Sequence, residues 1–359
     1  MQAAIKKIIK EQGSVYADTN RWAALQARID QLNPSKVFVL VDANTQEHCL
    51  PYFKEQLSDG LRFELLAIPA GEEHKTIATC LTVWQQLSDR GADRKSLIIN
   101  LGGGMVTDLG GFVGCTYRRG IRFINVPTTL LAMVDASVGG KTGVDLGVLK
   151  NQIGVIRLPE AVIVDPAFLD TLPVDEYRSG MAEVIKHGCI STKNYTLEAF
   201  KINKEHRGKQ LDLIWESIVL KDKIISEDPL EHGIRKALNF GHTLGHAIES
   251  YRLSSPLPSL LHGEAIAIGM ILELFISVQL QGFPQAELDM ISQHVVALYG
   301  KNDFSAEAID RIIELLIHDK KNSHGKVLFV LLENYGAPHL DQTVNNDLIR
   351  ESFSYYRNL

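Results

Sequence analysis

Three histidines lie close together in the sequence with a spacing that could hold a metal ion. His242 and His246 are four residues apart, so they would share one face of a helix, and His262 opens the next helical stretch. Three His or Glu side chains can bind Zn²⁺ and leave one position for substrate or water. Thr243 stands where the zincin motif requires glutamate, so the pattern does not indicate a protease. The alternative interpretation is that each histidine is structural.

Glu183 is a further candidate for this metal site. It falls within an expected helix over Tyr177–Gly188, one turn before Lys186. The two side chains could also form no more than an i, i+3 ion pair on a helix surface. The spacing alone therefore leaves the choice of ligands open.

A glycine-rich segment, Gly102–Gly111, follows an apolar run and leads into an apolar helix. Glycines let the backbone approach a phosphate closely, and a helix N-terminus supplies N–H donors. A plain glycine turn without a ligand would show the same sequence pattern. Asp42 ends an earlier run, where its carboxylate could hold a ribose. In the usual dinucleotide fingerprint the acid follows the glycines by about 20 residues, whereas here it precedes them. The pattern indicates a nucleotide-binding sheet with an unusual motif order.

The segment Asp135–Thr142 nearly fits the phosphate loop GxxxxGK[ST], but its first position is an acid that would repel phosphate, so an ATPase is not indicated. Lys141 remains a cation suited to an anionic ligand, and Lys150 follows nearby. Each lysine could equally be a solvated surface residue. In a net acidic protein, cations beside such segments predict a pocket for an anionic small molecule. The cations considered are Arg119, Lys141, Lys150, Lys186, Lys221, Arg235 and Lys320.

These residues need elements to position them, and the chain changes character near residue 172. Short apolar runs alternate with helical stretches in the first half, which predicts a parallel sheet with helices on both faces. Helical periodicity dominates afterwards, so we expect an α/β domain over 1–172 and an all-α domain over 173–359. The expected strands are Lys36–Asp42, Ser96–Leu101, Phe123–Val126 and Ala161–Asp165; the expected helices include Thr76–Arg90, Leu211–Ser226, Ala306–His318 and a buried Ala265–Leu280, with a loop at Leu253–Leu261.

Composition excludes several classes. With 359 residues, 45% of them hydrophobic, the chain can bury a large core and is not disordered. The net charge of −6 provides no broad basic face, so no nucleic-acid partner is expected. The four cysteines form no CxxC pair, which favours reduced thiols and a cytoplasmic protein. We expect no signal peptide and no membrane span.

Several longer segments, all in order between Asp42 and Lys321, resemble the 3-dehydroquinate synthase family of the sugar phosphate cyclase superfamily. The resemblance implies a nucleotide-binding α/β domain, a helical domain and an active site between them. It implies NAD and one divalent ion, usually zinc, with cobalt as the alternative. It also implies conversion of 3-deoxy-D-arabino-heptulosonate 7-phosphate to 3-dehydroquinate and phosphate. The matching segments are Gly102–Asp108, Pro127–Leu131, Val134–Thr142, Lys150–Asn151, Ala182–Lys186, Asn239–Glu249 and His262–Glu264.

The resemblance also implies roles for individual residues. The metal ligands would be Glu183, His242 and His262, while His246 would face the substrate phosphate. Asp135 and Lys186 would lie by the reacting centre, and Arg119 would reach the neighbouring subunit's site, which implies a homodimer. The substrate anions would be held by Lys141, Lys150, Asn151, Lys221, Arg235, Asn239 and Lys320, with Lys321 as the alternative to the last. NAD would be surrounded by Asp42, Asn44, Glu72, Lys75, Gly103, Gly104, Asp108, Thr128, Thr129, Lys141, Lys150, Phe168 and Thr171.

Two departures from the family pattern keep other functions open. Gly143-Val-Asp145 replaces the more usual Ala-Val-Asn, and Leu149 stands where glycine often precedes the Lys-Asn pair. The loop before His262 also looks longer than in many members. A sister cyclase acting on another sugar phosphate is the nearest alternative, followed by a metal- and NAD-dependent alcohol dehydrogenase and a non-catalytic NAD-binding protein.

Overall fold

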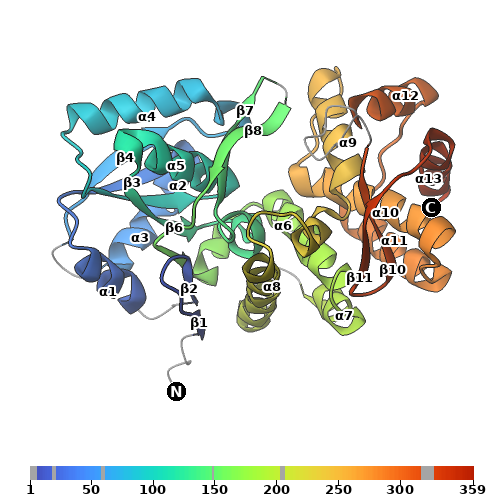
Figure 1. Ribbon diagram of the computed structural model, residues 1–359, viewed down its shortest axis with the longest axis horizontal. Helices are drawn as coiled ribbons and strands as arrows, with labels where there is room; N and C mark the ends of the chain where they lie inside the picture. Colours follow the sequence, from blue (N-terminus) through green and yellow to red (C-terminus); the bar gives the residue numbers. More distant parts are fainter. Residues whose placement is uncertain (1–5, 18–21, 58–60, 148, 203–206, 317–326) are drawn as a thin grey trace. The chain divides into compact units, whose positions relative to one another are not determined.

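The computed structural model describes the chain except for residues 1–5, 18–21, 58–60, 148, 203–206 and 317–326. The described residues form two compact units (Figure 1). The first comprises Met1–Tyr177 and Lys204–Val219, and the second comprises Arg178–Asn203 and Leu220–Leu359. The expected boundary lay at residue 172, whereas this division falls a few residues later, inside one continuous helix. Because the helical pattern of the sequence continues across residues 177 and 178, the sequence alone does not indicate this division.

The first unit is built on a seven-stranded sheet in the order β1-β2-β9-β6-β5-β3-β4. Every pairing is parallel except that of β1 with β2. The first five residues of β3, Val-Phe-Val-Leu-Val, are all buried, as expected for a strand covered on both faces. The predicted parallel sheet is confirmed. Its strands are β1 (Lys6–Ile8), β2 (Ser14–Ala17), β3 (Val37–Asp42), β4 (Glu64–Ile68), β5 (Leu97–Gly102), β6 (Arg122–Pro127) and β9 (Ala161–Val164).

Helices cover both faces of this sheet. Phe38 and Leu40 of β3 pack with α4 and α5 in one apolar cluster. The alternate residues Val39 and Val41 are also fully buried, so the opposite face is covered too. α5 starts directly after β5 and lies against β5 and β6. The helices that lie wholly in this unit are α1 (Ala23–Leu32), α2 (Ala43–His48), α3 (Leu50–Gln56), α4 (Ile77–Asp89) and α5 (Gly104–Thr116).

A separate antiparallel hairpin, β7 (Lys141–Leu146) with β8 (Leu149–Ile156), belongs to the first unit and was not predicted. In the sequence, its lysines and glycines had indicated a ligand-binding loop rather than two strands. Gly143 pairs with Gly154 across the hairpin, and a Cβ at Gly143 would lie 2.5 Å from the Ile153 carbonyl oxygen. The two strands therefore approach more closely than a side chain at this position would permit.

The second unit is helical, with one addition that the all-α expectation lacked. β10 (Phe329–Asn334) and β11 (Ala337–Gln342) form an antiparallel hairpin, and β10 packs against α10. Its short apolar run does not distinguish a strand from a buried helix by periodicity, which is why the sequence did not predict it. α6 and α8 run across the division between the units. The helices are α6 (Val174–Cys189), α7 (Lys193–Lys201), α8 (Arg207–Glu227), α9 (His242–Ser254), α10 (His262–Gln281), α11 (Gln285–Tyr299), α12 (Ala306–Leu315) and α13 (Asn346–Asn358).

Helix α10 forms the centre of this core. Among the described helices it is the one long and apolar enough to cross a membrane, yet 72% of its apolar window is buried inside the protein, as in a core helix. The buried helix expected over Ala265–Leu280 is confirmed. The loop expected from Leu253 begins later, because α9 continues to Ser254. His318, the expected end of α12, lies outside the described residues.

Candidate functional site

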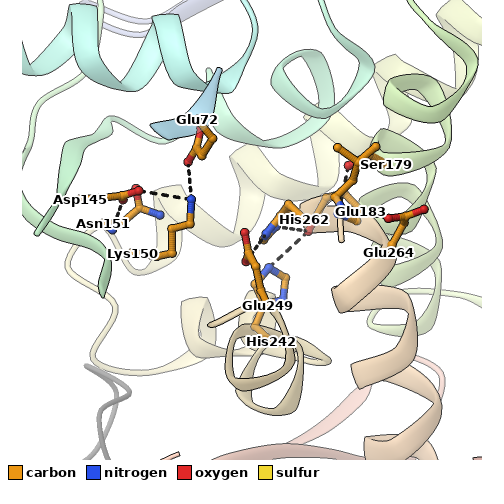
Figure 2. A network of polar contacts seen from close by, with 12 residues as sticks. Glu72, Asp145, Lys150, Asn151, Ser179, Glu183, His242, Glu249, His262 and Glu264 are labelled. Atoms are coloured by element: carbon orange, nitrogen blue, oxygen red, sulfur yellow. Dashed lines mark hydrogen bonds and ion pairs between the residues drawn. The ribbon is translucent and has the colours of Figure 1, made fainter. Parts of the chain in front are cut away.

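Three side chains from three helices of the second unit converge on one point (Figure 2). Glu183 comes from α6, while His242 and His262 are the first residues of α9 and α10. The Glu183 Oε1 atom lies 3.3 Å from His242 Nε2 and 3.6 Å from His262 Nε2. One ligand atom from each residue lies within 4.8 Å of the other two, which is close enough to share a metal ion. One carboxylate with two imidazoles is a donor set of catalytic zinc sites.

Glu183 carries a negative charge at this point. Its side chain is fully buried and forms an ion pair with Lys186, one turn along α6. Burial alone would raise the pKa of Glu183, but Lys186 and His242 outweigh burial and hold the pKa well below its usual range. The i, i+3 ion pair considered from the sequence is therefore present, and it lies in the core rather than on a helix surface.

The orientation of His262 is set by a second carboxylate. Glu249 Oε2 lies 3.3 Å from His262 Nδ1, so the other ring nitrogen, Nε2, is turned toward Glu183. Burial lowers the pKa of His262, but the contacts with Glu183 and Glu249 raise it to about 10. The ring must lose this proton before Nε2 can bind a metal. Sequence analysis assigned no role to Glu249, although it lies one turn after His246 on α9.

His246 offers an alternative grouping. Its ring centroid lies 5.2 Å from that of His242 and 5.9 Å from that of His262. His246, Glu249 and His262 could themselves hold an ion by distance. The rings of His242 and His246, expected from their i, i+4 spacing to share a helix face, thus lie next to each other. Within the described residues of this unit, two groups that share His262 could bind a metal.

The start of α10 is anchored to α6. The Gly263 N–H donates to Ser179 Oγ at 3.0 Å, and the Leu261 N–H donates to Glu264 Oε2 at 2.8 Å. A Cβ at Gly263 would lie 2.0 Å from the Ser179 carbonyl oxygen, so only glycine permits this contact. Ser179 and Glu183 are four residues apart on α6 and share a face. The face that presents Glu183 therefore also fixes the start of α10, and with it His262, a connection that sequence analysis missed.

Three of the anion-binding residues expected in the second unit lie in the short helix Ile234–Asn239 and on α8. Arg235 is buried and donates from Nη1 to the Pro229 carbonyl oxygen at 2.6 Å. Asn239 Nδ2 donates to Glu231 Oε1 at 2.9 Å, a contact that sequence analysis did not foresee. Lys221 is buried on α8. Lys320 and Lys321 lie outside the described residues.

In the first unit, the carboxyl ends of neighbouring parallel strands meet at one edge of the sheet. Asp42 ends β3, the Gly102–Gly104 turn follows β5, and Thr128 and Thr129 follow β6. From β3 the chain runs outward to β4 and returns to β5 on the other side of β3, so the strand order reverses here. Ligands of open α/β sheets bind at such a switch point. These members of the predicted nucleotide set therefore lie at strand ends where the fold favours a ligand.

The glycine turn leaves the start of α5 open. Gly103 is the N-cap residue and offers no side chain to the first-turn N–H groups, which are then suited to an anion. A Cβ at Gly103 would lie 2.9 Å from Thr129 Cγ2, while Gly104 has more space. The Thr128 N–H donates to the Gly102 carbonyl oxygen at 3.0 Å and ties the turn to β6.

Asp42 has a structural role of its own. Its Oδ1 accepts the Thr45 N–H at 2.7 Å, and the Thr45 hydroxyl accepts the Asp42 N–H, so the pair caps α2. Asn44 is exposed in the first turn of α2. An acid at the end of β3 is thus explained by helix capping, whether or not it also holds a ribose.

Lys75 is the buried centre of a polar network in the first unit. Its Nζ donates to Asp108 Oδ2 at 2.8 Å and to Asn151 Oδ1 at 2.6 Å, and lies 3.7 Å from Glu72 Oε1. Burial lowers the pKa of Lys75, but Asp108 and Glu72 raise it above its ordinary value, so the amine stays charged. All four residues were predicted site residues, drawn together from separate segments.

Lys150 extends this network (Figure 2). Its Nζ lies 3.1 Å from Glu72 Oε1 and 3.3 Å from Asp145 Oδ2. The Asn151 N–H donates to Asp145 Oδ1 at 2.7 Å, and Asn151 adopts a positive φ of 52°. Asp145, noted from the sequence only as a departure from the family pattern, therefore holds both residues of the Lys-Asn pair.

Phe168 and Thr171 lie in and just after the 3₁₀ helix Pro166–Asp170. The Phe168 ring is buried against Tyr52 and Trp22, with centroids at 5.2 and 5.6 Å. The ring thus packs in the core, so a cofactor at this segment would meet its backbone rather than the aromatic side chain.

The remaining predicted residues of the first unit lie in three irregular segments. Asp135 is half-buried in a π-helical turn, Ala132–Ala136, a form that is frequent at functional sites. Lys141 opens β7 and is exposed. Arg119 is also exposed, with a positive φ of 69°.

Family models and a relative of known name both match this chain over most of its length. The family model "3-dehydroquinate synthase N-terminal" matches residues 65–179, and the model "3-dehydroquinate synthase C-terminal" matches residues 180–322. A 3-dehydroquinate synthase of Parabacteroides distasonis is 44% identical over 335 residues, 93% of this chain and 94% of that one.

Two solved structures share the fold. A 2-epi-5-epi-valiolone synthase of Streptomyces hygroscopicus, solved with NAD⁺ and Zn²⁺ bound, is 25% identical at a TM-score of 0.83, covering 100% of this chain and 99% of that one. A 2-deoxy-scyllo-inosose synthase, solved with carbaglucose-6-phosphate, NAD⁺ and Co²⁺, is 24% identical at the same TM-score, covering 98% and 99%. With both family models and a close relative spanning most of its length, the chain belongs to the 3-dehydroquinate synthase family.

Proposed function

We propose that this protein converts 3-deoxy-D-arabino-heptulosonate 7-phosphate into 3-dehydroquinate and inorganic phosphate, a step of the shikimate pathway. One observation carries the proposal: the 44% identity over 93% of the chain to a protein of that activity. The cluster of Glu183, His242 and His262 supports it, because each of these metal-binding side chains is present and they converge in the fold.

Glu183, His242 and His262 hold a divalent ion, Zn²⁺ or Co²⁺. Imidazole and carboxylate donors suit either metal. We favour this group over the one containing His246 because Glu249 occupies Nδ1 of His262 and turns Nε2 toward Glu183. A carboxylate behind a metal-binding histidine is a recurrent arrangement that fixes the ring. His246 is then left to face the substrate phosphate.

NAD binds at the switch point of the first unit's sheet. The uncapped start of α5 fits a pyrophosphate, and the end of β3 is placed for the ribose. The first domain, 1–172, thus binds the nucleotide, and the second, 173–359, binds metal and substrate. The NAD-binding set is Asp42, Asn44, Glu72, Lys75, Gly103, Gly104, Asp108, Thr128, Thr129, Lys141, Lys150, Phe168 and Thr171.

The reaction needs an acidic proton beside the carbon that carries phosphate. When bound, NAD would accept and later return a hydride at C5 of the substrate, and the divalent ion would polarise the C5 oxygen. Once C5 is a ketone, the C6 proton is acidic, phosphate leaves by β-elimination, and the substrate's own phosphate takes that proton. Reduction, ring opening and an intramolecular aldol reaction then close the carbocycle.

The chain's residues mainly bind and orient this substrate. Cations would fix its carboxylate and phosphate, so that each step occurs between positioned groups. Asp135 and Lys186 would each act by the reacting carbon, and Lys186 forms an ion pair with the buried Glu183 carboxylate. The anion-binding set is Lys141, Lys150, Asn151, Lys221, Arg235, Asn239, His246 and Lys320.

The deciding experiment measures phosphate release from 3-deoxy-D-arabino-heptulosonate 7-phosphate with NAD and Zn²⁺ supplied. The expected result is release that a chelator abolishes, without accumulation of NADH. Net NADH would indicate an alcohol dehydrogenase instead. No release from metal- and NAD-loaded protein would refute the substrate, and other sugar phosphates would then be tried with attention to Gly143, Asp145 and Leu149.

We further propose a cytoplasmic homodimer in which Arg119 serves the neighbouring subunit's site. Its exposure permits such a contact. Mixing Arg119→Ala with Lys141→Ala protein tests this, because a mixed dimer keeps one intact site of its two. Random exchange should restore roughly a quarter of the wild-type activity. A mixture that stays inactive, or a monomer by sedimentation, would contradict the proposal.

A further inference from the structure

Helix α9 starts without a cap from its own segment. His242 is its first residue, and the preceding Gly241 has φ +78° and no side chain to accept a hydrogen bond. First-turn N–H groups need an acceptor from elsewhere when they are buried. Glu273 of α10 supplies one. The Gly241 N–H donates to its Oε2 at 2.7 Å, and the Leu244 N–H donates to its Oε1 at 3.1 Å.

Glu273 is fully buried in the middle of an apolar helix. A buried carboxylate is costly unless it accepts hydrogen bonds, and the positive end of a helix dipole favours it. His262, Ile266, Gly269 and Glu273 recur at helical spacing, so they lie along one face of α10. This face is in direct contact with α9, since a Cβ at Gly269 would lie 2.1 Å from the Gly241 carbonyl oxygen.

One face of α10 therefore carries His262 at its start and, about three turns later, the carboxylate that holds the start of α9. We infer that Glu273 is a positioning residue for the metal site: by fixing the first turn of α9 to α10, it sets His242 at its place relative to His262. This inference rests on the proposed metal ligands. Without the cap, the first turn of α9 frays and metal binding must reorder it.

Glu273→Gln tests this role because it keeps the side chain's shape. The amide nitrogen cannot accept a hydrogen bond, so one of the two N–H groups loses its acceptor. Ser277→Ala is the matched control. Ser277 is buried one turn further along α10, accepts the Leu332 N–H at 3.0 Å and donates to the Glu273 backbone oxygen. Its loss disturbs the packing of α10 on β10 without removing an acceptor from α9.

Two measurements are made on chelator-stripped protein: zinc affinity by competition with a zinc-binding dye, and hydrogen–deuterium exchange of peptides covering residues 241–246 before metal is added. Glu273→Gln is expected to weaken zinc binding about 10- to 100-fold, which is the usual effect of losing a group that holds a metal ligand in place. It is also expected to speed exchange at the start of α9. Ser277→Ala should change neither, even where both variants lower the melting temperature.

Zinc affinity of Glu273→Gln within about twofold of wild type would overturn the inference while leaving the metal ligands in place. If wild type itself binds no zinc, the ligand proposal fails, and exchange in the metal-free protein decides alone. Unchanged exchange at residues 241–246 then overturns the role of Glu273 as well, and faster exchange supports only its part in holding the start of α9. Should the glutamine variant not fold, Glu273→Asp keeps the charge but reaches less far, and partial loss is expected.

Discussion

Replacing Glu183 by glutamine should cost the metal-free protein about 3–5 kcal/mol of unfolding free energy. Glu183 is 0% and Lys186 1% exposed, and the two form an ion pair. Since the pKa of Glu183 is held well below its usual range, the carboxylate is charged, and its removal leaves the Lys186 ammonium buried without it. Lys186→Met alone should cost less, because the Glu183 carboxylate keeps its contacts with His242 and His262. The double variant removes both charges and should lose less than the sum.

The assay is urea unfolding with excess chelator, for wild type, each single variant and the double variant. Far-ultraviolet circular dichroism is the better probe, because the three tryptophans, Trp22, Trp84 and Trp215, all belong to the first unit. A coupling free energy of more than about 1 kcal/mol is expected for groups in contact. Costs that simply add, or single variants that lose less than about 1 kcal/mol, would refute the reasoning that the pair is buried and charged.

Four further results are expected. His262→Ala should abolish zinc binding and turnover, and full metal content with full activity would contradict its role as a ligand. Glu249→Gln should weaken zinc binding about 10- to 100-fold in dye competition, because the His262 ring loses the group that orients it; unchanged affinity would contradict this role and also the His246 grouping, in which Glu249 is itself a ligand. Lys141→Ala and Arg235→Ala should each lower kcat/KM for the phosphorylated substrate, and steady-state kinetics identical to wild type would remove them from the anion-binding set. Gly143→Ala should destabilise the β7–β8 hairpin by about 1–3 kcal/mol, because the added methyl meets the Ile153 carbonyl, and an unchanged melting temperature would show that the strands can separate freely.

The sheet could be predicted because its central strands are buried on both faces. Such strands read as continuous apolar runs, and Val37–Asp42 and Leu97–Gly102 are clear examples. The β7–β8 hairpin was missed for the opposite reason. β7 is Lys-Thr-Gly-Val-Asp-Leu, in which polar residues and a glycine give no run, and only its partner strand explains the glycine. A pairing between strands is a tertiary property that one strand's composition does not record.

The candidate site shows the same limit. Helical spacing paired His242 with His246, and their rings do lie 5.2 Å apart. Glu183 was a candidate from the sequence, but spacing could not select it as a ligand, because it comes from a helix distant in sequence. The family resemblance made that choice instead. Residues that orient others, such as Glu249 and Ser179, were missed since their function exists only through a contact made by folding.

Helix starts explain why this cluster needs so many acids. His242 and His262 each stand at the first residue of a helix, where the backbone is firmly placed but the helix end carries about half a positive charge. Two such ends would repel a divalent cation. Glu183 lies between the two histidines, Glu249 lies behind His262, and the carboxylate of Glu273 on α10 accepts hydrogen bonds from the start of α9, so carboxylates offset both helix ends. Replacing any of these acids by its amide should therefore weaken cation binding, including at Glu273, which is no candidate ligand.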